Sequence, residues 1–248
     1  MGCYGKTNQG MVRTNNEDYL FFSDGQIGSL PNLYIVADGM GGHNAGEVAS
    51  YTAVNELIKY IEENEKTVED TDILDILVEG VKYANEKTYA LSREKDSYKE
   101  MGTTIVAAVI KGSRIYVVNV GDSRLYRFRN GYLAQLTTDH TYVQMLVKNG
   151  EITEEEAQTH PKRNIIMRAV GTDDTVCCDG TIFNVLPDDT FLLCSDGLSG
   201  MLSDGEMAEI LSKDLTIEQK VNALIDAANE NGGNDNITVI IADGFSEV

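Results

Sequence analysis

Apolar side chains follow two different spacings along the chain, and these spacings predict two pairs of helices separated by strands. Residues 45–62 and 73–91 carry apolar side chains at three- and four-residue intervals, which is typical of amphipathic helices. Residues 203–206 and 216–219 each contain a capping box, a Ser or Thr followed three residues later by Glu or Gln, so a helix is expected to begin at each. The other apolar segments are short and rich in β-branched residues, as strands are.

The predicted strands are grouped around these helices in a way that indicates the fold class. They lie within residues 10–37, 105–110, 115–120, 125–128, 132–136, 182–185, 190–194 and 237–242. Asn130-Gly131 favours a tight hairpin turn because both residues tolerate positive φ. Helices segregated from hairpin-linked strands favour an α+β fold with sheet in the middle and helices outside. No internal repeat or linker interrupts the pattern, so we expect a single domain over residues 1–248.

One polar segment, residues 139–165, interrupts the series of strands. It is expected to be partly helical, because residues 153–156 form another capping box, and it continues into His160-Pro161-Lys162-Arg163. An insertion of this length between strands is more often functional than a simple connection. We therefore expect this segment to contribute to the site.

Acidic residues dominate the charge of the chain, with 40 Asp and Glu against 20 Lys and Arg and a formal net charge of −20 in 248 residues. Such a surface repels phosphate backbones, so no nucleic acid partner is expected, although bound cations would allow a phosphate substrate. No run approaches the roughly 20 apolar residues of a membrane span, and the N-terminus has no secretory signal. The four cysteines lack zinc-site spacing, which favours a reducing, cytoplasmic location.

Four acidic residues follow or precede predicted strands, each with Gly or Asn beside it. They are Asp38, Asp122, Asp196 and Asp235. Asp38 ends an apolar run at residues 33–37 and is followed by Gly39, and Asp196 repeats this arrangement. Any one of these acids is more often a turn-stabilising residue than a ligand. If the strand ends converge, however, the like charges need compensation, and a divalent cation supplies it.

The ligand types and one nearby cation indicate the chemistry of such a site. Oxygen ligands favour magnesium, manganese or calcium over zinc, copper or iron, and no EF-hand loop is present. Two cations held by acids are suited to in-line displacement at phosphorus. Arg13 could anchor a phosphate through its guanidinium group, although an Arg in such a position is usually a solvated surface residue. A metal-binding protein without chemistry would leave Arg13 and the polar insertion without a role.

Other hydrolase chemistries lack their sequence motifs. No Cys is followed six residues later by Arg, as a cysteine phosphatase requires. Asp70-Thr71-Asp72 is the nearest match to an aspartyl-phosphate motif, but its polar setting before a helix is better explained by capping. The P-loop motif and the G-x-S-x-G nucleophile elbow are absent. These competing chemistries are therefore set aside.

Eight segments, in order and spread over nearly the whole chain, resemble the bacterial form of the type 2C metal-dependent serine/threonine protein phosphatases, the PPM family. They are residues 10–18, 36–43, 101–104, 121–124, 139–140, 146–153, 195–198 and 233–238. The resemblance implies a four-layer α-β-β-α sandwich, with two central antiparallel sheets flanked by helix pairs. It also implies hydrolysis of phosphoserine and phosphothreonine in proteins by direct attack of a metal-bridging water.

The resemblance assigns metal-binding roles to five residues of this chain. Asp38 would bridge two Mn²⁺ or Mg²⁺ ions, and the carbonyl group of Gly39 would bind the second ion. Asp196 and Asp235 would complete the first site. Asp122 would reach a third, weaker ion.

The resemblance assigns catalytic and substrate-binding roles to three further residues. Asp18 would hold metal-bound water, and Arg13 would bind the substrate phosphate. Some family members have a histidine at the position of Met40, so His43 is the candidate general acid in this chain, with a structural role as the alternative. Residues 141–165 would form a mobile flap beside the cleft.

The resemblance also indicates partners. The expected substrates are phosphorylated proteins, including a bacterial Ser/Thr kinase and the proteins that it phosphorylates, and we expect a cytoplasmic monomer that binds neither nucleic acid nor membrane. The alternative is a catalytically silent family relative that binds phosphoproteins. Loss of metal-binding acids would be the mark of that alternative, and every expected acid is present.

Overall fold

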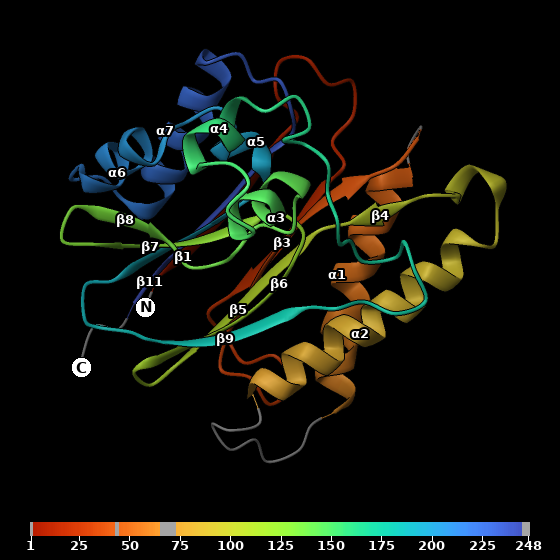
Figure 1. Ribbon diagram of the computed structural model, residues 1–248. Helices are drawn as coiled ribbons and strands as arrows, with labels where there is room; N and C mark the ends of the chain where they lie inside the picture. Colours follow the sequence, from red (N-terminus) through yellow and green to blue (C-terminus); the bar gives the residue numbers. More distant parts are fainter. Residues whose placement is uncertain (1, 43–44, 65–72, 245–248) are drawn as a thin grey trace.

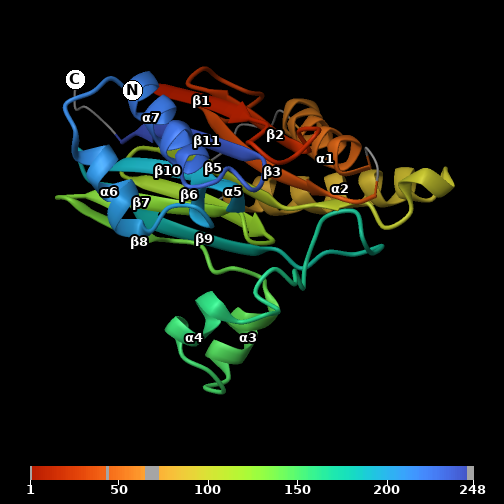
Figure 2. The ribbon, with the colours of Figure 1, turned by 90° about the horizontal axis from the view of Figure 1, so that it is seen from above.

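The computed structural model describes residues 2–42, 45–64 and 73–244. Its strands form two antiparallel sheets that pack face to face, and a pair of helices covers the outer face of each sheet (Figure 1 and Figure 2). The layers therefore follow the predicted order α-β-β-α. Within the described residues, no helix is both long enough and apolar enough to cross a bilayer.

The two sheets differ in strand order. The first sheet runs β2-β3-β5-β6-β9, with the short β4 paired to β3, and the second runs β1-β11-β10-β7-β8. The first contains β2 (Asp18–Ser23), β3 (Leu33–Met40), β4 (Gly102–Thr103), β5 (Ile105–Lys111), β6 (Arg114–Val120) and β9 (Asp179–Asn184). The second contains β1 (Cys3–Asn8), β7 (Arg124–Arg129), β8 (Tyr132–Gln135), β10 (Thr190–Cys194) and β11 (Ile237–Asp243).

The helices lie close to their predicted positions. The first sheet is covered by α1 (Ala45–Glu63) and α2 (Ile73–Ser92), and the second by α6 (Asp204–Ser212) and α7 (Ile217–Glu230). Ser203 and Thr216 form the predicted capping boxes at the starts of α6 and α7. Two short elements, η1 (Asp96–Tyr98) and α5 (Asp196–Ser199), complete the helical part of the sandwich.

Burial on both faces explains why residues 33–37 of β3 are all apolar. Leu33, Ile35 and Ala37 pack against the helix layer, while Tyr34 and Val36 point into the space between the sheets. All five side chains are fully buried. Because alternate residues of a strand face opposite sides, a strand buried on both faces needs apolar residues at every position. This burial fixes the register that places Asp38 near the end of β3.

The strands predicted within residues 10–37 are present as β2 and β3 but begin later than expected, and one further strand, β1, was not predicted. Residues 9–17 form a loop, and the strand predicted within 10–37 is confined to β2 and β3. The loop is polar, and several of its backbone groups bond to the side chain of Asn236 instead of to a neighbouring strand. Strand β1 was not predicted, because its side chains are mixed and only half buried, but it pairs along its whole length with β11.

Two further elements differ from the predictions. Strand β9 covers Asp179–Asn184 instead of residues 182–185, because its polar first half pairs with β6 while Val185 leaves the sheet. The short helix α5, which begins directly at Asp196, was not predicted. Its four residues are too few to produce a helical spacing in the sequence.

The predicted insertion forms a separate lobe, which we call the flap (residues 141–165). It contains α3 (Tyr142–Lys148) and α4 (Glu154–Thr159) and projects from the sandwich (Figure 2). Thr153 and Glu156 form the predicted capping box of α4. The base of the flap is closed by the Tyr142 N–H, which donates to the Ile165 carbonyl at 2.8 Å.

Candidate active site

Five acidic residues, which we call the carboxylate centre, meet at one edge of the sandwich. They are Asp18, Asp38, Asp122, Asp196 and Asp235. Asp18 and Asp38 are direct partners in the register of β2 and β3. Asp196 follows β10 and Asp235 precedes β11, and because these strands are antiparallel neighbours, the two ends lie side by side. Strand register therefore assembles the centre from both sheets.

Asp18 and Asp38 are held in place by hydrogen bonds, which in Asp18 leave Oδ1 without a partner among the described residues. Asp18 Oδ2 accepts from Ser195 Oγ at 2.8 Å and from Thr238 Oγ1 at 2.7 Å, so a residue of the first sheet is tied to the second. The main chain of Asp38 exchanges hydrogen bonds with Thr104, donating to its Oγ1 and accepting from its N–H, both at 2.9 Å. The carboxylates are thus positioned without being used up by the contacts that position them.

Burial is the largest cause of a raised pKa in four of these carboxyls, and repulsion among them adds to it. Burial raises the pKa of Asp18 to about 7, although the bonds from Thr238 and Ser195 lower it in part. The pKa of Asp122 also rises to about 7, through burial and then through the charge of a neighbouring acid. The pKa of Asp38 lies well above 3.8 because of burial and the charges of the other four acids.

The donor set fits hard divalent cations. Within the described residues, the buried Oδ1 atoms of Asp18, Asp122 and Asp196 have no hydrogen-bond partner. A buried carboxylate oxygen without a partner is costly, and a cation removes that cost. No group of three or more His, Cys, Asp or Glu side chains in the described part of the chain converges as a complete ligand set.

Glycines allow the backbone to approach closely around the centre. A Cβ at Gly39 would lie 2.1 Å from the Gly46 carbonyl oxygen, so the first turn of α1 could not approach the end of β3. A Cβ at Gly197 would lie 1.9 Å from the Asn236 carbonyl oxygen, which would separate the ends of β10 and β11. The two Asp-Gly pairs noted in the sequence therefore have glycine for reasons of space.

Arg13 lies at the rim of the carboxylate centre, on the loop of residues 9–17. Its Nη2 lies 2.6 Å from Asp235 Oδ2, and its side chain is 49% exposed, so the guanidinium group is accessible. The Asn236 side chain holds both ends of the loop: Nδ2 donates to the carbonyl groups of Gln9 and Asn15 at 2.9 and 2.8 Å. Sequence reasoning missed Asn236, whose signal was its place next to Asp235 in a polar run before a buried strand.

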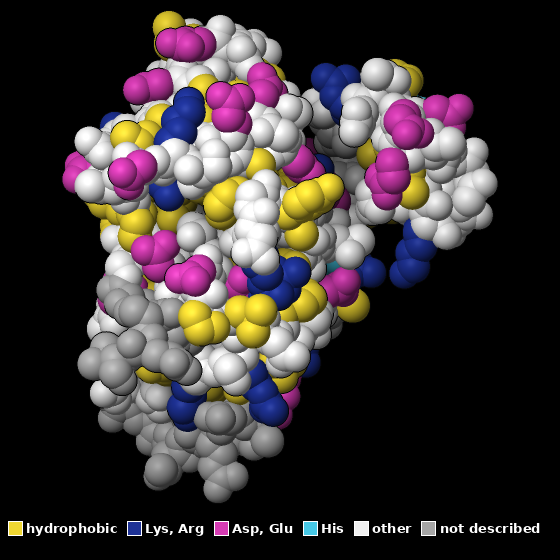
Figure 3. Space-filling view, turned by 90° about the vertical axis from the view of Figure 1, so that its left-hand side faces the viewer, with side chains coloured by type: hydrophobic (Ala, Val, Ile, Leu, Met, Phe, Trp, Pro, Cys, Tyr) yellow, Lys and Arg dark blue, Asp and Glu magenta, His cyan; other side chains and the backbone are white. Residues whose placement is uncertain are grey.

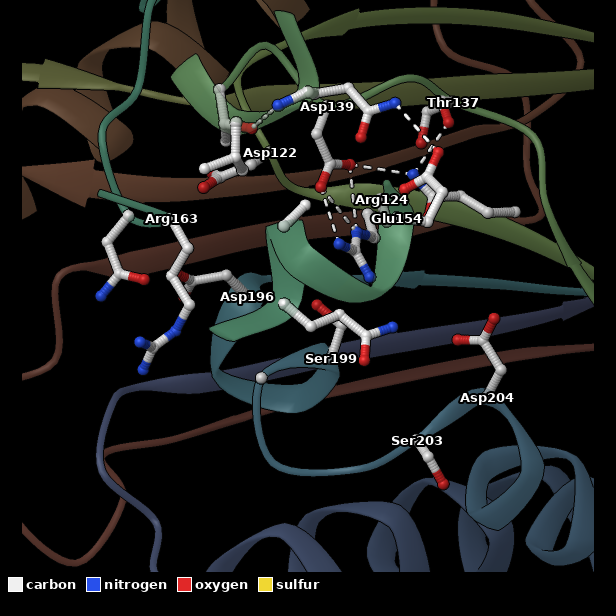
Figure 4. A pocket seen from close by; sticks show the side chains of 18 of the residues that line it. Asp122, Arg124, Thr137, Asp139, Glu154, Arg163, Asp196, Ser199, Ser203 and Asp204 are labelled. Atoms are coloured by element: carbon white, nitrogen blue, oxygen red, sulfur yellow. Dashed lines mark hydrogen bonds and ion pairs between the residues drawn. The ribbon is translucent and has the colours of Figure 1, made fainter. Parts of the chain in front are cut away.

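A cleft of about 850 Å³ leads from the centre and separates the sandwich from the flap. Figure 3 shows the flap as a lobe with a hollow between it and the body. Asp122 and Asp196 line one end of the cleft, Glu154 and Arg163 line the flap side, and Asp204 lies on the opposite wall (Figure 4). The cleft is large enough for a peptide segment beside the acids.

The structure thus brings together every predicted site residue except one. Arg13 and all members of the carboxylate centre lie at the same edge, and Gly39 follows directly on Asp38. His43 lies outside the described residues. Among the described residues, no histidine is hydrogen-bonded to the carboxylate centre, and Asp18 is bonded there to the hydroxyl groups of Ser195 and Thr238.

The family model described as protein phosphatase 2C matches residues 10–242 of the chain. The chain belongs to this family. It is 40% identical over 240 residues to the serine/threonine phosphatase stp of Listeria monocytogenes serotype 4b (strain F2365), covering 96% of this chain and 94% of the relative. The match to the family model starts at the Arg13 loop and ends in β11, so it includes the whole carboxylate centre.

Solved structures of the protein phosphatase 2C family show the same architecture. The structure of serine/threonine phosphatase Stp1 from Staphylococcus aureus superposes with a TM-score of 0.91 at 37% identity, covering 98% of this chain and 95% of that one. The catalytic domain of serine/threonine protein phosphatase PstP, solved in complex with two manganese ions, superposes with a TM-score of 0.84 at 36% identity, covering 98% and 97%.

Proposed function

We propose that this chain hydrolyses phosphoserine and phosphothreonine in proteins with the help of divalent metal ions. The observation that carries the proposal is the meeting of five acids from two sheets beside an accessible Arg. Three of these acids have a buried oxygen without a partner among the residues that the structure describes. A family model over residues 10–242 and a relative named serine/threonine phosphatase support the same activity. The silent alternative has no support, because no acid of the centre has been replaced.

The metal ligands are proposed as follows. Asp38 would contact two ions, with Asp196 and Asp235 on the first and the Gly39 carbonyl on the second, and Asp122 would bind a third. The ions would be Mn²⁺ or Mg²⁺, two or three per chain, which agrees with the two manganese ions in the PstP structure. When bound, they would supply Lewis-acid activation of water and neutralise charge on the phosphoryl oxygens.

The chain's own polar groups would orient the reactants. Arg13 can release Asp235 to a cation and turn its guanidinium fork to the substrate phosphate, since its side chain is half exposed. Asp18 would accept a hydrogen bond from water with Oδ1, because Oδ2 is already occupied by Ser195 and Thr238. His43 would donate a proton to the leaving serine or threonine oxygen, and its placement lies outside the described residues.

We further propose one catalytic domain over residues 1–248, with the flap contacting the peptide on either side of the phosphorylated residue. The substrates would be phosphoproteins, among them a bacterial Ser/Thr kinase and its targets. The protein would act as a monomer in the cytoplasm. The lining of the cleft supports the role of the flap in peptide binding, because flap residues lie beside the carboxylate centre but supply none of its acids.

The direct test is hydrolysis of a phosphothreonine peptide with Mn²⁺, with Mg²⁺ and with excess EDTA. We expect turnover with either ion and none with EDTA. Turnover that is indifferent to EDTA would overturn the metal-dependent mechanism. A phosphotyrosine peptide of the same sequence is the matched control and should be hydrolysed much more slowly.

A further inference from the structure

A buried histidine that the proposed mechanism does not use lies at the base of the flap. His140, 7% exposed, immediately precedes the flap. Its N–H donates to the Gly121 carbonyl at 2.9 Å, and its ring Nδ1 accepts from the Gly121 N–H at 3.1 Å. Its carbonyl accepts from the Met167 N–H at 2.7 Å. One residue therefore joins the incoming and outgoing ends of the flap to the residue before Asp122.

The contacts of the two ring nitrogens of His140 show which of them carries the proton. Nε2 lies 3.3 Å from Asp179 Oδ2, at the start of β9. Because Nδ1 accepts a backbone N–H, the ring proton is on Nε2 and is donated to Asp179. Arg168 Nη1 donates to Asp179 Oδ1 at 2.9 Å and lies 3.2 Å from Nε2. Its positive charge disfavours a second proton on the ring, because the ring would then be cationic as well. The neutral ring of His140 is thus bonded through Nδ1 to the Gly121 N–H and through Nε2 to Asp179.

The backbone on both sides of Asp122, at Gly121 and Ser123, is held in place by neighbouring groups. Gly121 adopts φ +99°, and a Cβ there would lie 2.5 Å from Thr104 Cγ2, so its backbone has little freedom to shift. The next residue but one, Ser123, shares a 2.6 Å hydrogen bond with Thr104 Oγ1, which also accepts from the Asp38 N–H. Asp122 lies between these two fixed points. Its Oδ1 is buried without a partner among the described residues.

We propose that His140 is a positioning residue that fixes Asp122 relative to the flap, through the hydrogen bond from the Gly121 N–H to its neutral ring. This inference rests on the proposed function of the centre. His140 touches neither substrate nor metal. It couples the flap to the site, because the same residue bonds to Gly121 on one side and to the outgoing end of the flap on the other.

Three substitutions separate the two sides of the ring. His140→Asn places an amide oxygen where Nδ1 stood and keeps an acceptor for Gly121, whereas His140→Ala removes both ring contacts. Asp179→Ala removes the partner of Nε2 alone. His160→Ala, at the C-cap of α4 in the flap, is the matched control for loss of a histidine. Thermal unfolding of each variant shows whether it is folded.

The deciding measurement is amide hydrogen exchange at Gly121 in the metal-free protein, which requires no activity. We expect faster exchange in His140→Ala and near wild-type protection in His140→Asn and His160→Ala, with Asp179→Ala between them. Equal exchange in His140→Ala and wild type, or equal loss in the Asn and Ala variants, would overturn the proposal. Failure of the proposed function would instead appear as an inactive wild type with these exchange differences intact.

Kinetics with a phosphothreonine peptide and Mn²⁺ give the functional readout. We expect His140→Ala to lower kcat about tenfold with little change in KM, in the range found for residues that orient metal ligands. His140→Asn should recover most of that loss. A folded His140→Ala variant with wild-type kcat would contradict the coupling of this residue to Asp122.

Discussion

The carboxylate centre and the flap border the same cleft, but different interactions hold them in place. Asp18 and Asp38 are opposite each other in a strand pair, and the β3 residues that precede Asp38 are fully buried. The flap consists of two helices of seven and six residues, shorter than the about 12 residues that an isolated helix needs for stability. Its helices bury few side chains: Val143, Leu146 and Ala157.

This difference separates chemistry from recognition. Groups that meet phosphorus must be held to a fraction of an ångström, and the register of two buried sheets does so. The flap, which borders the cleft through exposed residues such as Glu154 and Arg163, can change its sequence without disturbing that register. Substitutions in the centre should therefore act on kcat and metal dependence, and substitutions in the flap on the choice of peptide.

The largest expected effect is that of Asp38→Asn. Removing a shared carboxylate ligand should cost several kcal/mol of transition-state stabilisation, so kcat should fall by about 10³-fold or more. The metal-free variant should unfold at no lower temperature than the wild type, because a buried charge with a raised pKa has been removed. Glu154→Gln, an equal charge change on the flap, is the control and should leave kcat nearly unchanged. Similar losses in both variants would contradict the comparison.

Gly197→Ala tests whether close backbone packing holds the centre. Its Cβ would overlap the Asn236 carbonyl oxygen at 1.9 Å, and the strand ends that carry Asp196 and Asp235 would have to separate. We expect a loss of about 1–3 kcal/mol in the free energy of unfolding, measured with urea. Gly205→Ala is the matched control, since nothing lies within 4 Å of its Cβ position. Its stability should stay the same or rise.

The Arg13 loop gives the third prediction. Asn236→Asp keeps the acceptor for the Glu17 N–H at 2.8 Å but removes both donors to the carbonyl groups of the loop. We expect KM for a phosphopeptide to rise several-fold, as it should in Arg13→Ala, because both changes weaken a contact to substrate phosphate. Combining the two changes should add little to either. Fully additive effects would show that Asn236 does not act through Arg13.

Solution pH should change the stability of the centre in a direction fixed by its carboxyls. Asp18 and Asp122 have pKa values of about 7 when folded, against an ordinary value of 3.8, so the folded state binds more protons. Their stabilising contribution is present below about pH 4 and is lost as pH rises through about 7. In EDTA, the unfolding temperature should therefore fall between pH 5 and pH 8.

Metal ions and a substitution sharpen this pH test. Mn²⁺ binds the ionised carboxylates, so the unfolding temperature at pH 8 should rise more with Mn²⁺ than it does at pH 5. The net charge of −20 also favours lower pH through general repulsion. Asp18→Asn removes one of the two carboxyls and should reduce the slope in EDTA. An unchanged slope would assign the effect to general repulsion alone.

The sequence was sufficient for the elements that burial determines. The uninterrupted apolar run of β3 and the capping boxes at Ser203 and Thr216 led to correct elements, because each is decided by neighbouring residues. Strand β1 could not be predicted in this way: its half-buried residues become a strand only because β11 lies beside it. Its pairing partner is more than 200 residues away in the chain.

The site residues differ in the same way: some are indicated by neighbouring residues in the sequence, and others depend on distant parts of the chain. Repeated Asp-Gly pairs after apolar runs pointed to Asp38 and Asp196, since a strand end is visible in the sequence. The roles of Asn236 and His140 could not be seen, because each depends on bonds to loops that fold back from elsewhere. The place of Asn236 beside Asp235 in a polar run draws attention to it but does not show which backbone groups its side chain holds. The roles of both residues become visible only once the backbone atoms that they hold are placed.

The smallest expected effect lies in the flap. Thr153→Ala removes the side chain that accepts from the Glu156 N–H at 3.2 Å, at the start of α4. A lost N-cap costs about 1 kcal/mol, but α4 buries little, so the free energy of global unfolding should hardly change. Hydrogen exchange should instead accelerate within residues 154–159. Hydrolysis of p-nitrophenyl phosphate should keep its wild-type kcat, because that substrate lacks the peptide that the flap is proposed to contact, while KM for a phosphopeptide should shift. The same substitution at Ser203, which caps α6 on the second sheet, should lower global stability, since α6 packs into the core. Equal global losses at both caps would show that the flap is as firmly joined to the fold as the sandwich itself.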